Sequence, residues 1–251
     1  MNQNQIVTVT FFNFESTRNK WWMFGEMGKR SLNVKNMEVR HPDSIGTEGP
    51  SFAKMFGTGG GNGFSIRPDF GSYGWLSVWE SEKAAHDFFD NNANFKGFKA
   101  RSSGYFTVFL RVAAAHGLWD GVKPFEVTDT FDVNSPVAVL TRATIKPSQL
   151  HRFWRFVPSV SRSMEGKAGL IFSKGIGELP IVQQATFSLW TSAKAMMDYA
   201  YKSPEHAEVV RKTREYGWYS EEMFARFKVF DVEGNMAMCD TIRERLLVKN
   251  V

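Results

Sequence analysis

The chain has 251 residues, a hydrophobic share of 43% and a net charge of +5 from 31 basic and 26 acidic residues. This length suits one large domain or two small ones, and no Lys/Arg block indicates nucleic-acid binding. The single cysteine, Cys239, excludes an internal disulfide, fits a reducing cytoplasm and is expected to be structural. Because no apolar run reaches the length of a membrane span, we expect a cytoplasmic protein, with contact to the inner face of the membrane left open.

The first half of the chain predicts four strands and two helices. Its opening segment is rich in β-branched and aromatic residues, which favours a strand. In chain order the predicted elements are a strand at 6–14, a helix at 17–30, a short strand at 53–57, a flexible loop at 59–63, a strand ending at Trp79, a helix from Ser81 and a strand at 105–112.

The second half predicts the same order of elements. These are a strand at 137–144, a helix at 147–164, a strand at 170–174, a strand ending at Trp190, a helix from Ser192 and a strand at 224–231. The run that starts at Ser188 repeats the run that starts at Ser77, with six of thirteen positions identical. Trp79 and Trp190 then occupy equivalent corners, where we expect core residues.

Each half therefore reads β-α-β-β-α-β, the ferredoxin-like order. Two such halves pack their sheets face to face, so we expect an α+β fold of two fused repeats that form a dimeric-type α+β barrel. We assign residues 1–120 to the first ferredoxin-like repeat, 121–136 to a linker, and 137–251 to the second repeat, which is the candidate cofactor-binding half.

One histidine has the features of a metal ligand. Ser203 suits a helix N-cap and Pro204 the first helical position, which places His206 in the first turn. A helix N-terminus and burial both disfavour imidazolium, so His206 is expected to be neutral and could ligate a metal axially. A core histidine bonded to a backbone carbonyl remains an open alternative. The other histidines and Cys239 do not show the spacing of a zinc site.

The last strand differs between the two halves. We match the apolar face of Phe106, Val108, Leu110 and Val112 to the series Phe224, Arg226, Lys228 and Phe230. In an enclosed sheet, Arg226 and Lys228 need anionic partners. The propionates of a haem would serve, and so would Asp or Glu side chains, and both readings stay open. Arg142 and Lys174 are further candidates for such contacts.

Several unusual segments occur in an order that resembles the spheroidene monooxygenase family of carotenoid ketolases. The resemblance extends over most of the chain, from about Val7 to Val229. The segments that carry it are Phe11–Phe14, Phe24–Gly28, Met55–Phe64, Gly117–Gly121, Lys174–Glu178, Gln184–Trp190 and Trp218–Phe227. The resemblance implies a haem-dependent monooxygenase that inserts oxygen from O₂ into an acyclic carotenoid to give a ketone, with electrons from a donor such as ferredoxin. The order Trp190, helix, His206 is also similar to the haem-degrading monooxygenases of the same barrel superfamily, which implies His206 as the iron ligand.

The expected site therefore lies in the second half, with haem between the sheet and the helix that carries His206. We expect aromatic side chains to line the oxygen pocket and cations to contact the haem. The aromatic candidates are Phe187, Trp190, Trp154 and Phe227, and the cationic ones are Arg226, Lys174, Arg142 and Lys228. Three rivals stay open: a haem enzyme of this barrel class acting on another small hydrophobic substrate, such as a dehydratase or peroxidase-like enzyme; a non-catalytic haem- or lipid-binding barrel; and a haem-free structural protein.

Overall fold

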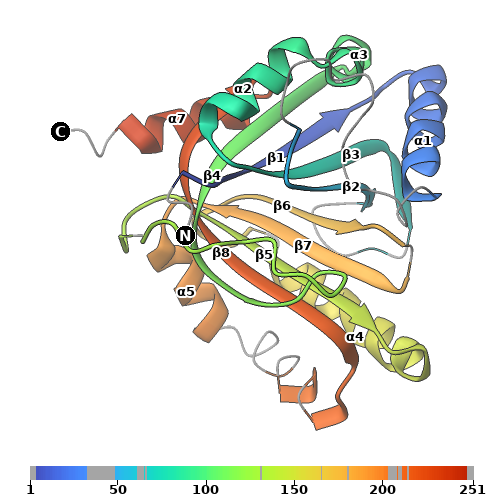
Figure 1. Cartoon of the computed structure of the whole chain (residues 1–251). Coiled ribbons are helices and arrows are strands. Elements are labelled where there is room, and N and C mark those ends of the chain that lie inside the picture. The colour runs from blue at the N-terminus through green and yellow to red at the C-terminus, as the bar shows by residue number, and fades with distance from the viewer. Residues whose placement is uncertain are drawn as a thin grey trace.

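A computed structural model describes residues 4–32, 49–60, 65, 67–130, 132–164, 166–179, 181–202, 208, 211–213 and 215–247. Eight antiparallel strands form one closed barrel, in the order β1-β3-β2-β6-β7-β5-β8-β4 (Figure 1). The expected α+β barrel of two fused ferredoxin-like repeats is confirmed. Within the described residues, no helix is both long and apolar enough to cross a membrane.

The first half supplies β1, β3, β2 and β4, and the second half supplies β6, β7, β5 and β8. The elements of the first half are β1 (Ile6–Asn13), α1 (Thr17–Leu32), β2 (Phe52–Gly59), β3 (Pro68–Trp79), α2 (Glu82–Asn91), α3 (Ala93–Arg101) and β4 (Gly104–Gly117). Those of the second half are β5 (Val137–Ile145), a 3₁₀ turn (Pro147–Gln149), α4 (Leu150–Met164), β6 (Leu170–Gly177), β7 (Gln183–Trp190), α5 (Ala193–Lys202), β8 (Tyr219–Gly234) and α7 (Met238–Leu247).

The two halves meet along two seams of unequal length. Strands β4 and β8 pair from Phe106 opposite Gly234 to Gly117 opposite Met223. Strands β2 and β6 pair at only two positions, Gly57 with Gly177 and Thr58 with Ile176. The barrel is therefore tightly closed on one side and only briefly hydrogen-bonded on the other.

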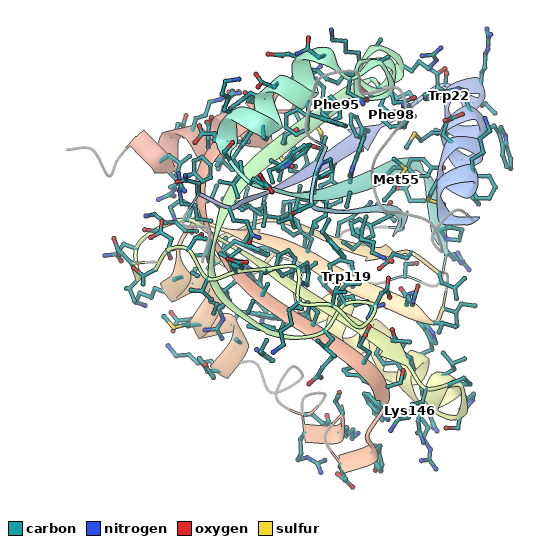
Figure 2. All side chains as sticks on the ribbon, in the orientation of Figure 1. Trp22, Met55, Phe95, Phe98, Trp119 and Lys146 are labelled. Atoms are coloured by element: carbon teal, nitrogen blue, oxygen red, sulfur yellow. The ribbon has the colours of Figure 1, made fainter. Side chains whose placement is uncertain are left out.

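Strands of this barrel bury both faces, because one face lines the interior and helices cover the other. On β1, Val7, Val9 and Phe11 belong to the barrel core, whereas Ile6 and Phe12 pack beneath the helices. In Figure 2, Trp22, Phe95 and Phe98 lie on the helix side of the first half and Trp119 lies within the barrel. This double burial explains why every residue of β1 except Asn13 is buried.

The structure corrects several details of the predicted elements. Strands β2 and β6 are longer than expected, and β8 begins at Tyr219 instead of residue 224. Helices α3 and α7 were not predicted. The loop predicted over 59–63 lies mostly outside the described residues, as does the predicted helix start at 203–206.

The residues of β8 that face the barrel interior are shifted by one position from the prediction. Met223, Ala225, Phe227 and Val229 point into the barrel core, so Arg226 and Lys228 lie on the outer face. Irregularities in the β4–β8 pairing, at Phe109/Leu110 and Val112/Ala114, shift the register between the strands. A shift of one residue exchanges the two faces of a strand, and a sequence comparison of the two halves cannot detect such bulges.

Candidate functional site

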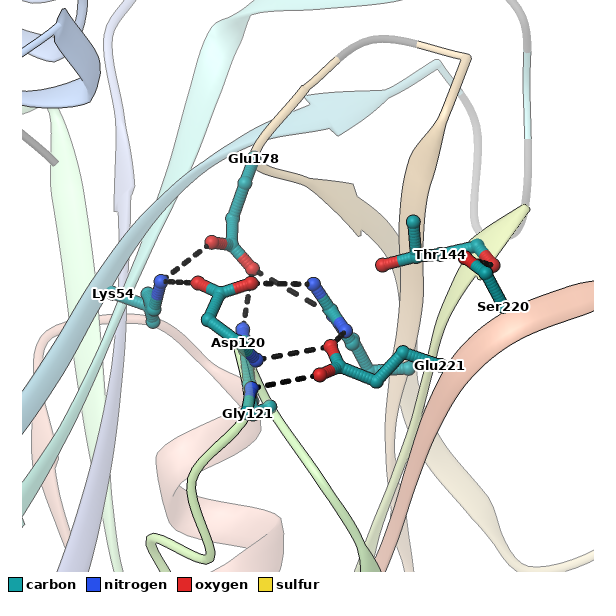
Figure 3. A network of polar contacts seen from close by, with 9 residues as sticks. Lys54, Asp120, Gly121, Thr144, Glu178, Ser220 and Glu221 are labelled. Atoms are coloured by element: carbon teal, nitrogen blue, oxygen red, sulfur yellow. Dashed lines mark hydrogen bonds and ion pairs between the residues drawn. The ribbon is translucent and has the colours of Figure 1, made fainter. Parts of the chain in front are cut away.

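Five charged side chains gather inside one end of the barrel (Figure 3). We call Lys54, Asp120, Arg142, Glu178 and Glu221 the charged cluster. Four of these residues, all except Asp120, lie on strands or directly after a strand end. Each is two residues away from a residue of the barrel core, and side chains two residues apart on a strand point to the same face. The interior references are Phe56 for Lys54, Leu140 for Arg142, Ile176 for Glu178 and Met223 for Glu221.

Arg142 is the centre of the cluster, and its side chain is 1% exposed. Its guanidinium forms an ion pair with Glu221, lies 3.0 Å from Asp120 and approaches Glu178 at 3.9 Å. Lys54 pairs with Asp120 and, at 2.9 Å, with Glu178. Arg142 was predicted to contact an anionic cofactor, but in the structure protein carboxylates surround it.

A tight turn carries Asp120 into the cluster. Trp119 and Val122 exchange backbone hydrogen bonds, and both central residues have positive φ, 51° at Asp120 and 78° at Gly121. Asp-Gly is the residue pair that a turn with two positive φ values favours. The two backbone N–H groups at Asp120 and Gly121 donate to the carboxylate of Glu221 at 2.9 and 2.8 Å, which fixes the turn against β8.

Glycine is required where this turn leaves β4. Gly117 has φ of 92°, and a Cβ at this position would lie 2.1 Å from the carbonyl oxygen of Glu222. The chain therefore passes directly over the end of β8 and enters the barrel mouth. The Gly117–Gly121 segment reaches the cluster only because no side chain stands at its first position.

Trp119 closes this end of the barrel. Its indole is fully buried, stacks on Phe56 with ring centroids 5.9 Å apart and donates from Nε1 to Glu178 at 2.6 Å. The guanidinium carbon of Arg142 lies 5.6 Å from the centroid of the Trp119 ring. The Trp119 indole and the charged cluster thus close the end of the barrel at which β5 and β6 end.

The cluster contains two cations and three carboxylates, which leaves a net charge of −1. Burial lowers the pKa of Lys54, but Glu178 and Asp120 outweigh it and hold that pKa above the ordinary value of 10.5. Burial raises the pKa of Glu221, but the N–H groups of Gly121 and Asp120 and the charge of Arg142 hold it below 4.5. Both groups are therefore charged at neutral pH.

The opposite end of the barrel is hollow. A cavity of about 530 Å³, here called the rim cavity, opens beside the first residues of β6. Its apolar lining includes Phe11, Phe106, Phe172, Met164, Met236 and Met238, and its polar lining includes Asn13, Ser72, Ser173 and Lys174. The rings of Phe11, Phe106 and Phe172 are in mutual contact, with centroids 4.9–5.3 Å apart. Lys174 lies 3.0 Å from the carboxylate of Asp69.

The residues predicted to form one oxygen pocket do not lie together. Phe187 and Phe227 are fully buried inside the barrel. Trp190 packs on the outer face against Tyr199 and donates to Ser188 at 3.0 Å. Trp154 lies on α4, where it borders an open depression. The prediction of a single pocket was wrong because Phe187 and Trp190 are three residues apart on one strand and so face opposite sides.

The four cationic side chains predicted to contact the haem also lie on opposite faces of the barrel wall. Arg142 and Lys174 point into the barrel, where each forms an ion pair with carboxylates of the chain. Arg226 and Lys228 lie on the outer face of β8, and Lys228 pairs with Asp129 at 2.9 Å. His206 is outside the described residues, so its position relative to these side chains remains a prediction.

The charged cluster was missed by the sequence reasoning, although its residues were in view. Glu178 ends the segment Lys174–Glu178, Asp120 belongs to Gly117–Gly121, and Glu221 belongs to Trp218–Phe227. A Trp-Asp pair between two glycines outside any predicted strand is an unusual pattern and indicates a turn with a specific contact, but only the closed barrel brings the three segments together. Within the described part of the chain, no group of three or more His, Cys, Asp and Glu side chains is arranged to hold a metal ion.

Solved structures define the class of fold. Two crystal structures of aldoxime dehydratases, one of them in complex with butyraldoxime, superpose with TM-scores of 0.57 and 0.59. They cover 90% and 96% of this chain, and the matches span 82% and 86% of those chains. At 9% and 10% identity the likeness shows the α+β barrel fold alone. No family model matches the chain.

Sequence relatives define the family. Proteins named spheroidene monooxygenase from Cereibacter sphaeroides, Rhodobacter capsulatus and Rubrivivax gelatinosus are 31%, 30% and 38% identical to this chain. The matches cover 98%, 96% and 76% of this chain and 73%, 97% and 73% of those proteins. The chain belongs to the spheroidene monooxygenase family.

Proposed function

We propose that the protein is a haem-dependent monooxygenase that inserts oxygen into an acyclic carotenoid, or a similarly long apolar chain, to give a ketone. The observation that carries this proposal is the 30% identity to the Rhodobacter capsulatus spheroidene monooxygenase, which extends over 96% of this chain and 97% of that protein. Two hydroxylations of one CH₂ group give a geminal diol, which loses water to form the ketone. Each insertion consumes one O₂ and two electrons, which an external donor such as ferredoxin supplies.

The rim cavity supports an apolar substrate. Its floor is the contact cluster of Phe11, Phe106 and Phe172, and methionines, which adapt to irregular shapes, line its walls. Because the charged cluster and Trp119 close the other end of the barrel, a long chain cannot pass through it. The cavity would therefore receive one end of the substrate and leave the rest outside.

The outer face of β8 fits the proposed haem better than the barrel interior does. The interior is filled by side chains such as Phe11 and Phe187, whose ring centroids are 5.8 Å apart. On the outer face, Arg226 is half-buried beside the ring of Phe224, and its Nε has no hydrogen-bond partner within the described residues. An enclosed guanidinium donor of this kind suits a carboxylate such as a haem propionate.

On this proposal Arg226 would bind a propionate, Trp190 at the end of β7 and Trp154 on α4 would flank the haem pocket, and His206 would ligate the iron. Bound haem would supply the activation of O₂, while the protein supplies the ligand, an apolar surrounding and the orientation of the substrate. Lys228 is a weaker candidate because Asp129 already pairs with it. Lys174 lines the rim cavity and would act on the substrate side, whereas Arg142 belongs to the charged cluster that closes the other end of the barrel.

An absorption spectrum tests the haem and its ligand. The protein purified with haem supplied should show a Soret band, and His206→Ala should shift or abolish it. His86→Ala removes a half-buried histidine on α2, in the first half of the chain, and is the matched control, which should keep the wild-type spectrum. An unchanged Soret band and axial-ligand spectrum in His206→Ala would remove His206 from this role.

Product analysis tests the reaction itself. Haem-loaded protein, reductant, O₂ and a detergent-dispersed acyclic carotenoid should yield a product heavier by one oxygen and lighter by two hydrogens. Turnover of a small aldoxime or another small hydrophobic substrate without carotenoid oxidation would favour a different haem enzyme on the same fold. The absence of O₂ consumption would favour a binding protein. We further propose a cytoplasmic enzyme that collects its substrate at a membrane surface.

A further inference from the structure

Three large aromatic side chains are exposed at one edge of the molecule. Trp21 and Phe24 lie on α1 and are 61% and 42% exposed, and Phe70 lies near the start of β3 and is 41% exposed. Their rings contact one another, with centroids 5.5–5.9 Å apart. We call these three residues the aromatic patch. Exposed aromatic residues normally scatter singly, and a contiguous group of them marks an interaction surface.

A β-bulge aims Phe70 outward. On β2, Gly57 stands opposite Tyr73 while Thr58 stands opposite Asp69, so Phe70, Gly71 and Ser72 are skipped in the strand pairing. Three hydrogen bonds hold the bulge: Thr58 Oγ1 donates to Ser72 O at 2.9 Å, Gly71 N donates to Asp69 Oδ1 at 2.9 Å, and Phe14 N donates to Gly71 O at 2.7 Å. Bulges commonly redirect a side chain at the end of a sheet, and this one places Phe70 against Trp21.

The helix that carries the patch is basic. Its sequence contains four basic residues and one acidic residue, and its first turn has no acidic residue. The acidic residue, Glu26, forms an ion pair with Lys29 at 2.8 Å. Because Glu26 pairs with Lys29, Arg18 and Lys20 give the first turn of α1, beside Trp21 in the sequence, an excess of positive charge. Figure 1 shows α1 along the edge of the molecule, outside the sheet formed by β1, β2 and β3.

The bulge also forms part of the rim cavity. Ser72, two residues after Phe70, lines the cavity, and Asp69, one residue before it, holds the cavity-lining Lys174 at 3.0 Å. The segment Asp69–Ser72 thus presents an aromatic ring to the outside and polar groups to the cavity. A surface that binds the aromatic patch therefore lies close to the rim cavity.

We infer that the aromatic patch and the basic residues of α1 dock the protein on an anionic lipid bilayer, which places the rim cavity at the membrane surface; the inference rests on the proposed function for the identity of its substrate. Aromatic rings flanked by Lys and Arg suit the boundary between headgroups and acyl chains, where the rings are buried and the cations meet lipid phosphates. A long apolar substrate dissolves in the same layer. Docking through this surface removes the need to carry the substrate through water.

The test is co-sedimentation of the full-length protein with lipid vesicles. Vesicles of phosphatidylcholine with 30% phosphatidylglycerol should bind the wild-type protein at least tenfold more strongly than the triple variant Trp21→Ser/Phe24→Ser/Phe70→Ser. The matched control is Tyr201→Ser, which removes a 72% exposed aromatic residue from α5 and should bind like the wild type. Circular dichroism confirms that the variants are folded. Equal binding of the triple variant and the wild type overturns the inference, as does wild-type protein that binds neither these vesicles nor vesicles of pure phosphatidylcholine.

A second variant keeps the rings and removes the charge. Arg18→Gln/Lys20→Gln should lose the preference for phosphatidylglycerol while it retains the weaker binding to pure phosphatidylcholine. If this variant keeps its full preference, the basic face of α1 is not the contact and the inference fails. Self-association of the wild-type protein that the triple variant abolishes, without vesicle binding, would identify the patch as an interface between copies instead.

Vesicle binding and turnover report on separate claims. Binding is measured without haem or substrate, and turnover is measured with substrate in detergent micelles. Turnover in micelles without vesicle binding would refute the docking surface and leave the proposed function intact. Vesicle binding without carotenoid oxidation would support the docking surface and refute the proposed function.

Discussion

Trp119 donates its indole N–H to Glu178 across 2.6 Å, and this single contact joins the turn after β4 to the end of β6. The same carboxylate lies 2.9 Å from Lys54 on β2. Three segments from both halves of the chain therefore meet at one side chain. Strands β2 and β6 pair at only two positions. The ion pair between Lys54 and Glu178 therefore reinforces the barrel where its backbone pairing is weakest.

Removal of the central cation should destabilise the barrel strongly. Arg142→Met leaves Asp120, Glu178 and Glu221 close together with only Lys54 to balance them. Breaking a buried ion pair from one side costs about 3–5 kcal/mol, because the remaining charges are left without a partner. We expect the free energy of unfolding, measured by urea denaturation, to fall by about 3 kcal/mol.

The control for this change is an exposed ion pair. Lys29→Met breaks the pair between Lys29, whose side chain is 73% exposed, and Glu26. Exposed pairs contribute about 0–1 kcal/mol, so this variant should unfold close to the wild-type midpoint. If Arg142→Met unfolds at the same urea concentration as Lys29→Met, the charged cluster does not stabilise the fold.

Acid should weaken the fold through Glu221. The N–H groups of Gly121 and Asp120 and the charge of Arg142 overcome the effect of burial and hold its pKa below the ordinary value of 4.5. A carboxyl whose pKa is lower in the folded state contributes stability above its unfolded pKa, and this contribution is lost as the pH falls through the folded pKa. The unfolding free energy should therefore decline below about pH 4.5.

Glu221→Gln removes that titration and should flatten this part of the pH profile while it lowers stability at pH 7. Glu222→Gln changes the next residue along β8 and is the matched control. A profile of Glu221→Gln that remains parallel to the wild-type profile between pH 5 and pH 3 would contradict the assignment.

The sequence was sufficient for the architecture because strand and helix patterns depend on neighbouring residues. The Ser77 and Ser188 runs do mark equivalent strand ends, and the barrel class follows from the repeated order of elements. The faces of β8 could not be predicted, because two bulges in the pairing with β4 alter the register without a sequence signal. The charged cluster was equally hidden, since Lys54, Asp120 and Glu221 come from distant segments that only barrel closure unites.

The two equivalent tryptophans provide a test of the internal repeat. Trp79 donates to Thr8 at 2.8 Å and Trp190 donates to Ser188 at 3.0 Å, and both are 1% exposed. Trp79→Phe and Trp190→Phe each remove one buried hydrogen bond and leave a small cavity, which should cost about 1–3 kcal/mol. The two variants serve as controls for each other in thermal and urea unfolding. Destabilisation by Trp79→Phe alone would show that Trp190 is not a core residue of the same kind.

Occlusion of the rim cavity should weaken substrate binding without loss of haem. Met236 is half-buried and lines the cavity, so Met236→Trp places a larger ring in the space proposed for the end of the substrate. We expect KM for an acyclic carotenoid to rise at least tenfold while the Soret band keeps its wild-type intensity. Leu179→Trp adds the same ring at a residue that is 52% exposed and does not line the cavity, and should leave KM unchanged. A wild-type KM in folded Met236→Trp would place the substrate outside the rim cavity, whereas a weakened Soret band in this variant alone would show that the cavity and the haem site share their walls.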